Sequence, residues 1–178
     1  MAGGLDPGTC HEKRGGRGEK KAQCLGRSRG GLTTKLHAVC DGAGTPLALQ
    51  LSAGQRHDAP QFESVCEQVR VRRRPRQLVA DRGYDAQHIR RWLRRRRIRA
   101  AIPRRRPAKG RCCRRRGRPP HIELRRYARR NVIERFFGSL KEHRRVATRY
   151  DKHDQHFLAM VQIACIRRIL QHHFSDTA

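Results

Sequence analysis

Residues 131–152 read NVIERFFGSLKEHRRVATRYDK, and the fold is best understood outward from this stretch. Written on a helix at about 100° per residue, its large apolar side chains fall on one face. These side chains are Val132, Ile133, Phe136, Phe137 and Leu140. The pattern predicts a helix that packs this face against the core of the protein.

A row of polar side chains lies on a different face of the same helix. If the helix begins at Tyr127, steps of three or four residues align five positions, which are Tyr127, Arg130, Glu134, Gly138 and Lys141. One carboxylate among cations is typical of a site that handles phosphate or a metal ion. A solvated face with ordinary i,i+4 ion pairs has the same spacing, so the spacing leaves both interpretations open.

The charge of the chain is strongly unbalanced. Its 178 residues include 43 Lys and Arg against 15 Asp and Glu, which gives a net charge of +28. Nucleic acid is the partner that such a charge predicts, with an anionic membrane surface as the weaker alternative. No apolar run is long enough to span a membrane, and no signal-peptide core begins the chain, so we expect a cytoplasmic, nucleoid-associated protein.

The order of the predicted elements indicates an α/β fold. Residues 1–29 are rich in Gly, Lys and Arg and are predicted to be a disordered basic arm. Residues 32–41 and 45–52 alternate apolar and polar side chains, which predicts an antiparallel hairpin with one buried face. Asp58 is a possible N-cap for a helix at 59–71. The pattern further predicts a strand at 77–81, a helix at 86–97, a strand at 98–103 and, after the Glu134 helix, a helix at 157–174.

We therefore expect one domain at 30–174, in which a mixed sheet is flanked by helices. The last helix would pack on the sheet or on the Glu134 helix, and its inward side chains would be Leu158, Val161, Cys165, Ile166 and Ile169. An arginine-rich insert occupies 104–120. Fifteen arginines fall between residues 90 and 118, and those of the insert, including Arg104, Arg105 and Arg106, would bind phosphates without sequence preference or form a solvated loop.

Several carboxylates follow or begin predicted elements. Asp81 ends a short buried strand, the position at which ligands often bind α/β sheets, and Asp58 and Asp85 are the other loop carboxylates nearby. Together with Glu134, such residues can hold Mg²⁺ against a phosphodiester, because Mg²⁺ takes oxygen ligands and needs few protein carboxylates. Taken alone, an aspartate at the position of Asp81 is more commonly a cap at the end of a strand or a surface residue. The seven cysteines have no zinc-site spacing and are expected to be free thiols.

Three segments, in this order, resemble bacterial insertion-sequence transposases of the DDE type, in the group called insertion sequence family five, with an IS4-like transposase domain. They are residues 20–60, residues 78–86 (LVADRGYDA) and residues 127–152. The last carries the group's Y-R-E-K signature as Tyr127, Arg130, Glu134 and Lys141. The similarity extends over about residues 20–170.

The resemblance implies an RNase H-like catalytic core. Asp81 would be the second acid and Glu134 the third, and both would bind Mg²⁺ or Mn²⁺ for attack on phosphodiesters. Tyr127, Arg130 and Lys141 would contact DNA near the scissile phosphate. His57 and Asp58 lie in the family's G-Q-x-H-D turn, bordering the site. DNA in the form of terminal repeats and target is the implied partner, with a homodimer as a further expectation.

The chain departs from the family pattern at its beginning. The first acid of the family lies on a strand before the segment GRSRGG, and Asp6 is the only aspartate before Asp41. Asp6 precedes a proline and follows no apolar run, so we expect an N-terminally truncated copy that lacks this strand and acid. Enzymatic activity is therefore left open. A non-catalytic, basic nucleic-acid-binding protein is the alternative, and it would bind with strong salt dependence and no need for metal.

Overall fold

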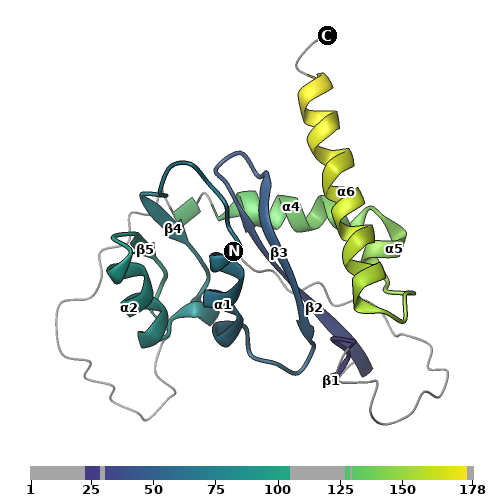
Figure 1. Ribbon diagram of the computed structural model, residues 1–178, viewed down its shortest axis with the longest axis horizontal. Helices are drawn as coiled ribbons and strands as arrows, with labels where there is room; N and C mark the ends of the chain where they lie inside the picture. Colours follow the sequence, from purple (N-terminus) through teal and green to yellow (C-terminus); the bar gives the residue numbers. More distant parts are fainter. Residues whose placement is uncertain (1–22, 29–30, 105–126, 129, 176–178) are drawn as a thin grey trace.

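The computed structural model describes residues 23–28, 31–104, 127–128 and 130–175 (Figure 1). Strands β2 (Gly31–Cys40) and β3 (Pro46–Ala53) pair antiparallel, with Leu36 opposite Leu51 and Ala38 opposite Leu49. The Asp41 carboxylate closes the turn, since it accepts hydrogen bonds of 2.9 Å from the backbone N–H groups of Ala43, Gly44 and Thr45. The predicted hairpin is confirmed.

The prediction that only one face of this hairpin is buried is wrong. Leu36 and Ala38 face the helices that follow later in the chain, but His37 and Val39 on the opposite face are buried too. Helix α1 (Asp58–Glu67) covers that second face, where Val65 packs on Val39 and Ala48. Helix α1 is shorter than predicted, and Asp58 is its first residue, while His57 is the N-cap.

A small parallel unit follows α1. Strands β4 (Gln77–Val79) and β5 (Arg99–Ala101) pair in parallel, and the 3-10 helix η1 (Arg82–Tyr84) and helix α2 (Gln87–Arg95) form the crossover between them. Phe62 of α1 packs edge-on against Trp92 of α2, with ring centroids 5.6 Å apart. Helix α1 therefore joins this unit to the hairpin.

The strands do not form the single mixed sheet that the sequence predicts. Among the described residues, β1 (Gly26–Ser28), β2 and β3 form an antiparallel sheet, and β4 and β5 form a separate parallel one. No described strand bridges β2 and β4, so the α/β class is confirmed while the mixed sheet is not. Sequence analysis also missed β1, because three residues of Gly, Arg and Ser show no alternation.

The C-terminal helices cover the other face of the hairpin. Helix α4 (Asn131–Lys141) buries Ile133, Phe136, Phe137 and Leu140 as predicted, and ends before the short helix α5 (Arg144–Ala147). Helix α6 (Asp154–Ser175) packs against β3, α4 and α5 through Phe157, Val161, Ala164 and Cys165. Ile166 was predicted to point inward, but it is 56% exposed. None of the described helices is both long and apolar enough to cross a membrane.

Candidate functional site

The Asp81 side chain is fixed directly beyond strand β4. Its backbone is extended, with φ −77° and ψ 179°, and it is the N-cap of η1. One carboxylate oxygen accepts a hydrogen bond of 2.7 Å from the backbone N–H of Gly83. A Cβ at position 83 would lie 2.8 Å from that oxygen, so glycine is required for this close approach.

Two further carboxylates flank this strand end but have different surroundings. The Asp85 side chain is fully buried and pairs with Arg90 at 2.9 Å, while Arg90 also donates to the carbonyl of Ile102 at 2.7 Å. These contacts make Asp85 a packing residue of α2 and β5. Asp58 lies at the start of α1, 3.1 Å from the ammonium group of Lys35, and the neighbouring His57 is exposed.

Tyr84 lies in the field of two carboxylates from different segments. Burial raises the pKa of the Tyr84 phenol, and the negative charges of Asp58 and Asp81 raise that pKa further. Tyr84 is 2% exposed, and within the described part of the chain its hydroxyl has no hydrogen-bond partner. The start of α1 packs against η1, which brings Asp58 within range of this phenol.

Helix α4 begins at Asn131 and not at Tyr127, so Arg130 is its N-cap and only Glu134, Gly138 and Lys141 of the expected row lie on the helix. Glu134 is 53% exposed and pairs with the Arg130 guanidinium at 2.6 Å, and Arg130 lies over the ring of Tyr127 at 5.7 Å from the centroid. Lys141 is exposed seven residues further along. The apolar face of α4 holds this row in place by packing against the hairpin. A Cβ at Gly138 would meet no atom within 4 Å, so its lack of a side chain is not required by packing.

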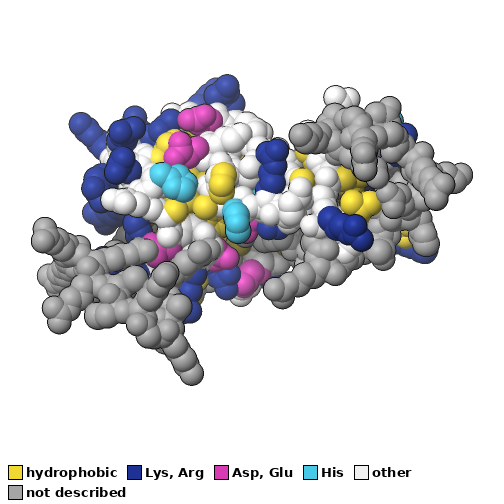
Figure 2. Space-filling view, turned by 90° about the horizontal axis from the view of Figure 1, so that it is seen from below, with side chains coloured by type: hydrophobic (Ala, Val, Ile, Leu, Met, Phe, Trp, Pro, Cys, Tyr) yellow, Lys and Arg dark blue, Asp and Glu magenta, His cyan; other side chains and the backbone are white. Residues whose placement is uncertain are grey.

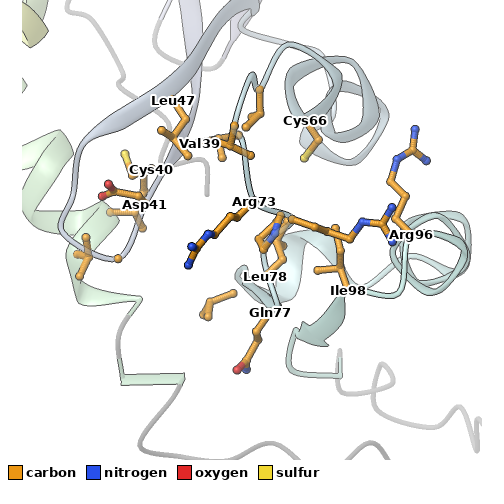
Figure 3. A pocket seen from close by; sticks show the side chains of 18 of the residues that line it. Val39, Cys40, Asp41, Leu47, Cys66, Arg73, Gln77, Leu78, Arg96 and Ile98 are labelled. Carbon is orange, nitrogen blue, oxygen red and sulfur yellow. The ribbon is translucent and has the colours of Figure 1, made fainter.

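A cavity of about 810 Å³ lies beside strand β4 and the start of α4 (Figure 3). Leu78 and Val79 of β4 line it, as do Arg130 and Ile133. Its wall is apolar at Val39, Leu47 and Ile98, and arginines border it, among them Arg72, Arg73, Arg74 and Arg96. Neither Asp81 nor Glu134 lines this cavity.

The carboxylates that could bind a metal ion, Asp81 and Glu134, lie on separate elements. No group of three His, Cys, Asp or Glu side chains gathers within the residues described in Figure 1. The chemistry of Asp81 and Glu134 nevertheless suits a divalent ion such as Mg²⁺, which binds hard oxygen ligands and completes its shell with water. Asp81 in particular presents an oxygen whose orientation the Gly83 hydrogen bond fixes.

Arginines concentrate at the end of the molecule that carries α2 (Figure 2). The exposed ones belong to α2 and to the segment before β4, and include Arg72, Arg73, Arg74, Arg91, Arg94, Arg95 and Arg97. Arg96 also stacks on Trp92, with its guanidinium 3.8 Å from the ring centroid. Arg104 is partly buried, whereas Arg105, Arg106 and the rest of the predicted insert, like Asp6 and residues 1–22, lie outside the described residues.

Arg149 is a structural residue that sequence analysis did not single out. It is 1% exposed, and its guanidinium donates to the carbonyls of Asp151 and Lys152 and to the Thr34 hydroxyl. A fully buried arginine is rare, and nothing in its sequence neighbourhood distinguishes it from the exposed Arg144 and Arg145. This arginine fastens the loop between α5 and α6 to strand β2.

A family model for the transposase DDE domain matches residues 8–169 of this chain. The chain belongs to the DDE transposase domain family. The match includes both Asp81 and Glu134 and spans the hairpin, the parallel unit and the C-terminal helices. The predicted membership is confirmed, and it assigns the chain to the insertion-sequence transposases.

Two relatives agree with this assignment. A Brucella ovis protein assigned as a transposase for insertion sequence element IS6501 is 34% identical over 134 residues, which cover 75% of this chain and 95% of the relative. A Burkholderia cepacia protein assigned as a transposase for insertion sequence element IS402 is 31% identical over 161 residues, which cover 86% of this chain and 69% of the relative. No solved structure matches the chain.

Proposed function

We propose that this transposase domain binds DNA and catalyses metal-dependent hydrolysis of phosphodiesters and strand transfer. The observation that carries the proposal is the linked set of Tyr127, Arg130 and Glu134 at the start of α4, within a chain that matches the family model over residues 8–169. A guanidinium such as that of Arg130 can bind a phosphate, so the Glu134 carboxylate beside it would lie next to the bound phosphate. An RNase H-like arrangement of the elements is part of the proposal.

Asp81 and Glu134 are the residues that would hold a divalent metal, Mg²⁺ or Mn²⁺. When bound, such an ion lowers the pKa of an attacking water and stabilises charge on the phosphate oxygens. Gly83 holds the Asp81 carboxylate in position through its backbone N–H. Glu134 lies on a helix that is anchored by four buried side chains, so its backbone position is also well defined.

Tyr127, Arg130 and Lys141 would contact the DNA backbone. Arg130 can pair with both Glu134 and a phosphate, because a guanidinium has five N–H donors in a planar fork. Arg104 and the exposed arginines of α2 would extend this surface without reading sequence. The DNA would be the terminal repeats of an insertion sequence and its target.

A cleavage and strand-transfer assay on terminal-repeat DNA, with Mg²⁺ or Mn²⁺, tests the proposal. Asp81→Asn and Glu134→Gln should each lower the rate by at least about a hundredfold, because each removes a charged metal ligand. Glu142→Gln is the matched control, since Glu142 is exposed at the end of the same helix, and it should retain the wild-type rate. Unchanged cleavage by Glu134→Gln would remove this residue from the mechanism.

A non-catalytic DNA-binding protein is the second candidate function, and the exposed arginines around α2 favour it. It predicts binding that weakens steeply with salt, no dependence on metal, and no cleavage. If the wild-type chain binds DNA but cleaves no substrate, and Asp81→Asn and Glu134→Gln leave binding unaltered with and without Mg²⁺, this second function replaces the first.

A further inference from the structure

Two exposed imidazole rings lie beside each other at the start of helix α6. His153 directly precedes the helix, and His156 belongs to its first turn. The centroids of the two rings are 5.3 Å apart, and both side chains are exposed. A neutral imidazole offers one ring nitrogen with a free lone pair. Two nitrogens that can bind a metal ion are therefore close together at the surface.

The backbone that carries the two histidines is held on both sides. The Arg149 guanidinium donates to the carbonyls of Asp151 and Lys152, directly before His153. The His153 carbonyl accepts a hydrogen bond of 3.2 Å from the backbone N–H of Phe157, whose side chain is 1% exposed. Ligands that are already held near their bound arrangement lose less conformational entropy when an ion binds, which favours binding.

We propose that His153 and His156 form a binding site for Zn²⁺. Zn²⁺ binds imidazole nitrogens at about 2.0–2.1 Å, and two imidazoles at a tetrahedral angle then have their centroids roughly 5 Å apart. The centroid distance of 5.3 Å agrees with this arrangement. Bonds of the same length at a right angle, as in octahedral and square-planar sites, would bring the centroids to roughly 4.5 Å.

This site differs from the proposed catalytic metal site in its ligands and in its place. Mg²⁺ prefers oxygen ligands, whereas imidazole nitrogens favour ions such as Zn²⁺. Asp81 precedes η1 and Glu134 belongs to α4, while the two histidines are at the start of α6. The inference therefore does not depend on the proposed catalytic function.

The charges around the two histidines oppose each other. The net charge of +28 and the N-terminal end of α6 both disfavour a bound cation. Asp154 lies between the two histidines in the sequence, in the first turn of α6. Its carboxylate accepts hydrogen bonds from the Gln155 N–H at 2.8 Å and from the Cys24 thiol at 3.4 Å. The negative charge of this fixed carboxylate offsets part of the repulsion.

The number of protein ligands sets the expected affinity. Within the described part of the chain, no third His, Cys, Asp or Glu completes a ligand set. Water would fill the other positions on the ion, as it does at an open zinc site. The dissociation constant should therefore be on the order of 10 micromolar or weaker. Because the ion would link the residue before α6 to the first turn, hydrogen exchange of the amides in this turn should slow when Zn²⁺ binds.

NMR spectroscopy of the full chain, with ¹⁵N in its histidine rings, tests the proposal. In a titration with Zn²⁺ at pH 7.5, the ring signals of His153 and His156 should shift together along one saturation curve. At pH 5.5 these shifts should be lost, because protons compete with the metal for the ring nitrogens. Mg²⁺ should leave both signals unchanged. Each ring is observed separately, so Zn²⁺ that binds cysteines elsewhere in the chain does not obscure the result.

Substitutions test whether the two rings act together. His153→Gln and His156→Gln should each raise the dissociation constant at the remaining ring at least about tenfold, because one ring alone no longer holds the ion for the other. His88→Gln removes an exposed histidine of α2 and should change neither signal nor affinity. Circular dichroism should show an unchanged fold for all three variants. Rings that do not shift, that titrate along separate curves, or that bind Zn²⁺ equally well in either single variant would overturn the proposal.

Discussion

Arg149→Lys is the substitution for which the structure makes the most definite stability prediction. The Arg149 guanidinium donates from Nε to the Asp151 carbonyl at 2.9 Å, from one terminal nitrogen to the Thr34 hydroxyl at 2.5 Å, and from the other to the Lys152 carbonyl at 3.0 Å. Lysine keeps the positive charge but carries a single nitrogen. It cannot reach three acceptors that a planar fork serves from three separate positions.

The expected cost follows from the bonds lost. A hydrogen bond from a charged group contributes about 1.5–3 kcal/mol net, and at least two of the three would be lost at a site that water does not reach. Allowing for some relaxation, Arg149→Lys should lower the free energy of unfolding by about 3–4 kcal/mol. For a chain of this length, that corresponds to a fall in Tm of roughly 10 °C.

Urea denaturation followed by circular dichroism measures this difference. Arg145→Lys is the matched control, because Arg145 belongs to the same helix–loop region and pairs with the Asp151 side chain at 3.1 Å, yet its own side chain is 58% exposed. A surface pair of this kind contributes about 0–1 kcal/mol, so the control should change stability by less than that. Equal effects of Arg149→Lys and Arg145→Lys would refute the role of the buried fork.

Three further predictions rest on other contacts. Asp85→Asn should lower the free energy of unfolding by about 3 kcal/mol, because it leaves Arg90 without its buried counter-charge, and thermal denaturation measures this. Gly138→Ala should raise stability by about 0.5–1 kcal/mol in the same measurement, because the site is exposed, helical and open to a Cβ. Burial lowers the pKa of His37, which hydrogen-bonds to Ser52 at 2.7 Å. The unfolded chain therefore binds more protons at this residue, so stability should fall as the pH drops below about 6.5, and His37→Gln should lessen that fall in urea denaturation at pH 7.5 and 5.5.

Much of the local structure could be read from periodicity and turn chemistry. The β2–β3 hairpin follows from alternating apolar residues on each side of a turn that Asp41 closes, and all of its hydrogen bonds lie close in sequence. The Arg130–Glu134 pair likewise follows from a step of four residues at the start of α4. These features depend on neighbours along the chain, so the sequence contains them directly.

For the candidate site residues, the sequence did not predict the surroundings of each side chain. Asp81, Asp85 and Glu134 look alike as acids near element ends, yet Asp85 is buried against Arg90, while Asp81 and Glu134 retain access to solvent. The packing of α1 on η1 likewise joins segments that are well separated in the sequence. Burial and proximity of this kind depend on how α1 and α2 pack together, which no local pattern specifies.

The sequence by itself therefore determined the hairpin, the order of the elements from β2 to α4, the Arg130–Glu134 pair and the family of the chain. Only the tertiary structure decided that both faces of β2 are buried, that Arg149 is enclosed while Arg145 is exposed, and that Ile166 points away from the core. The physical reason is that an apolar or charged side chain specifies which environment it favours, whereas long-range packing decides which side chains receive that environment. On α6 this packing covers one apolar face and leaves the other exposed.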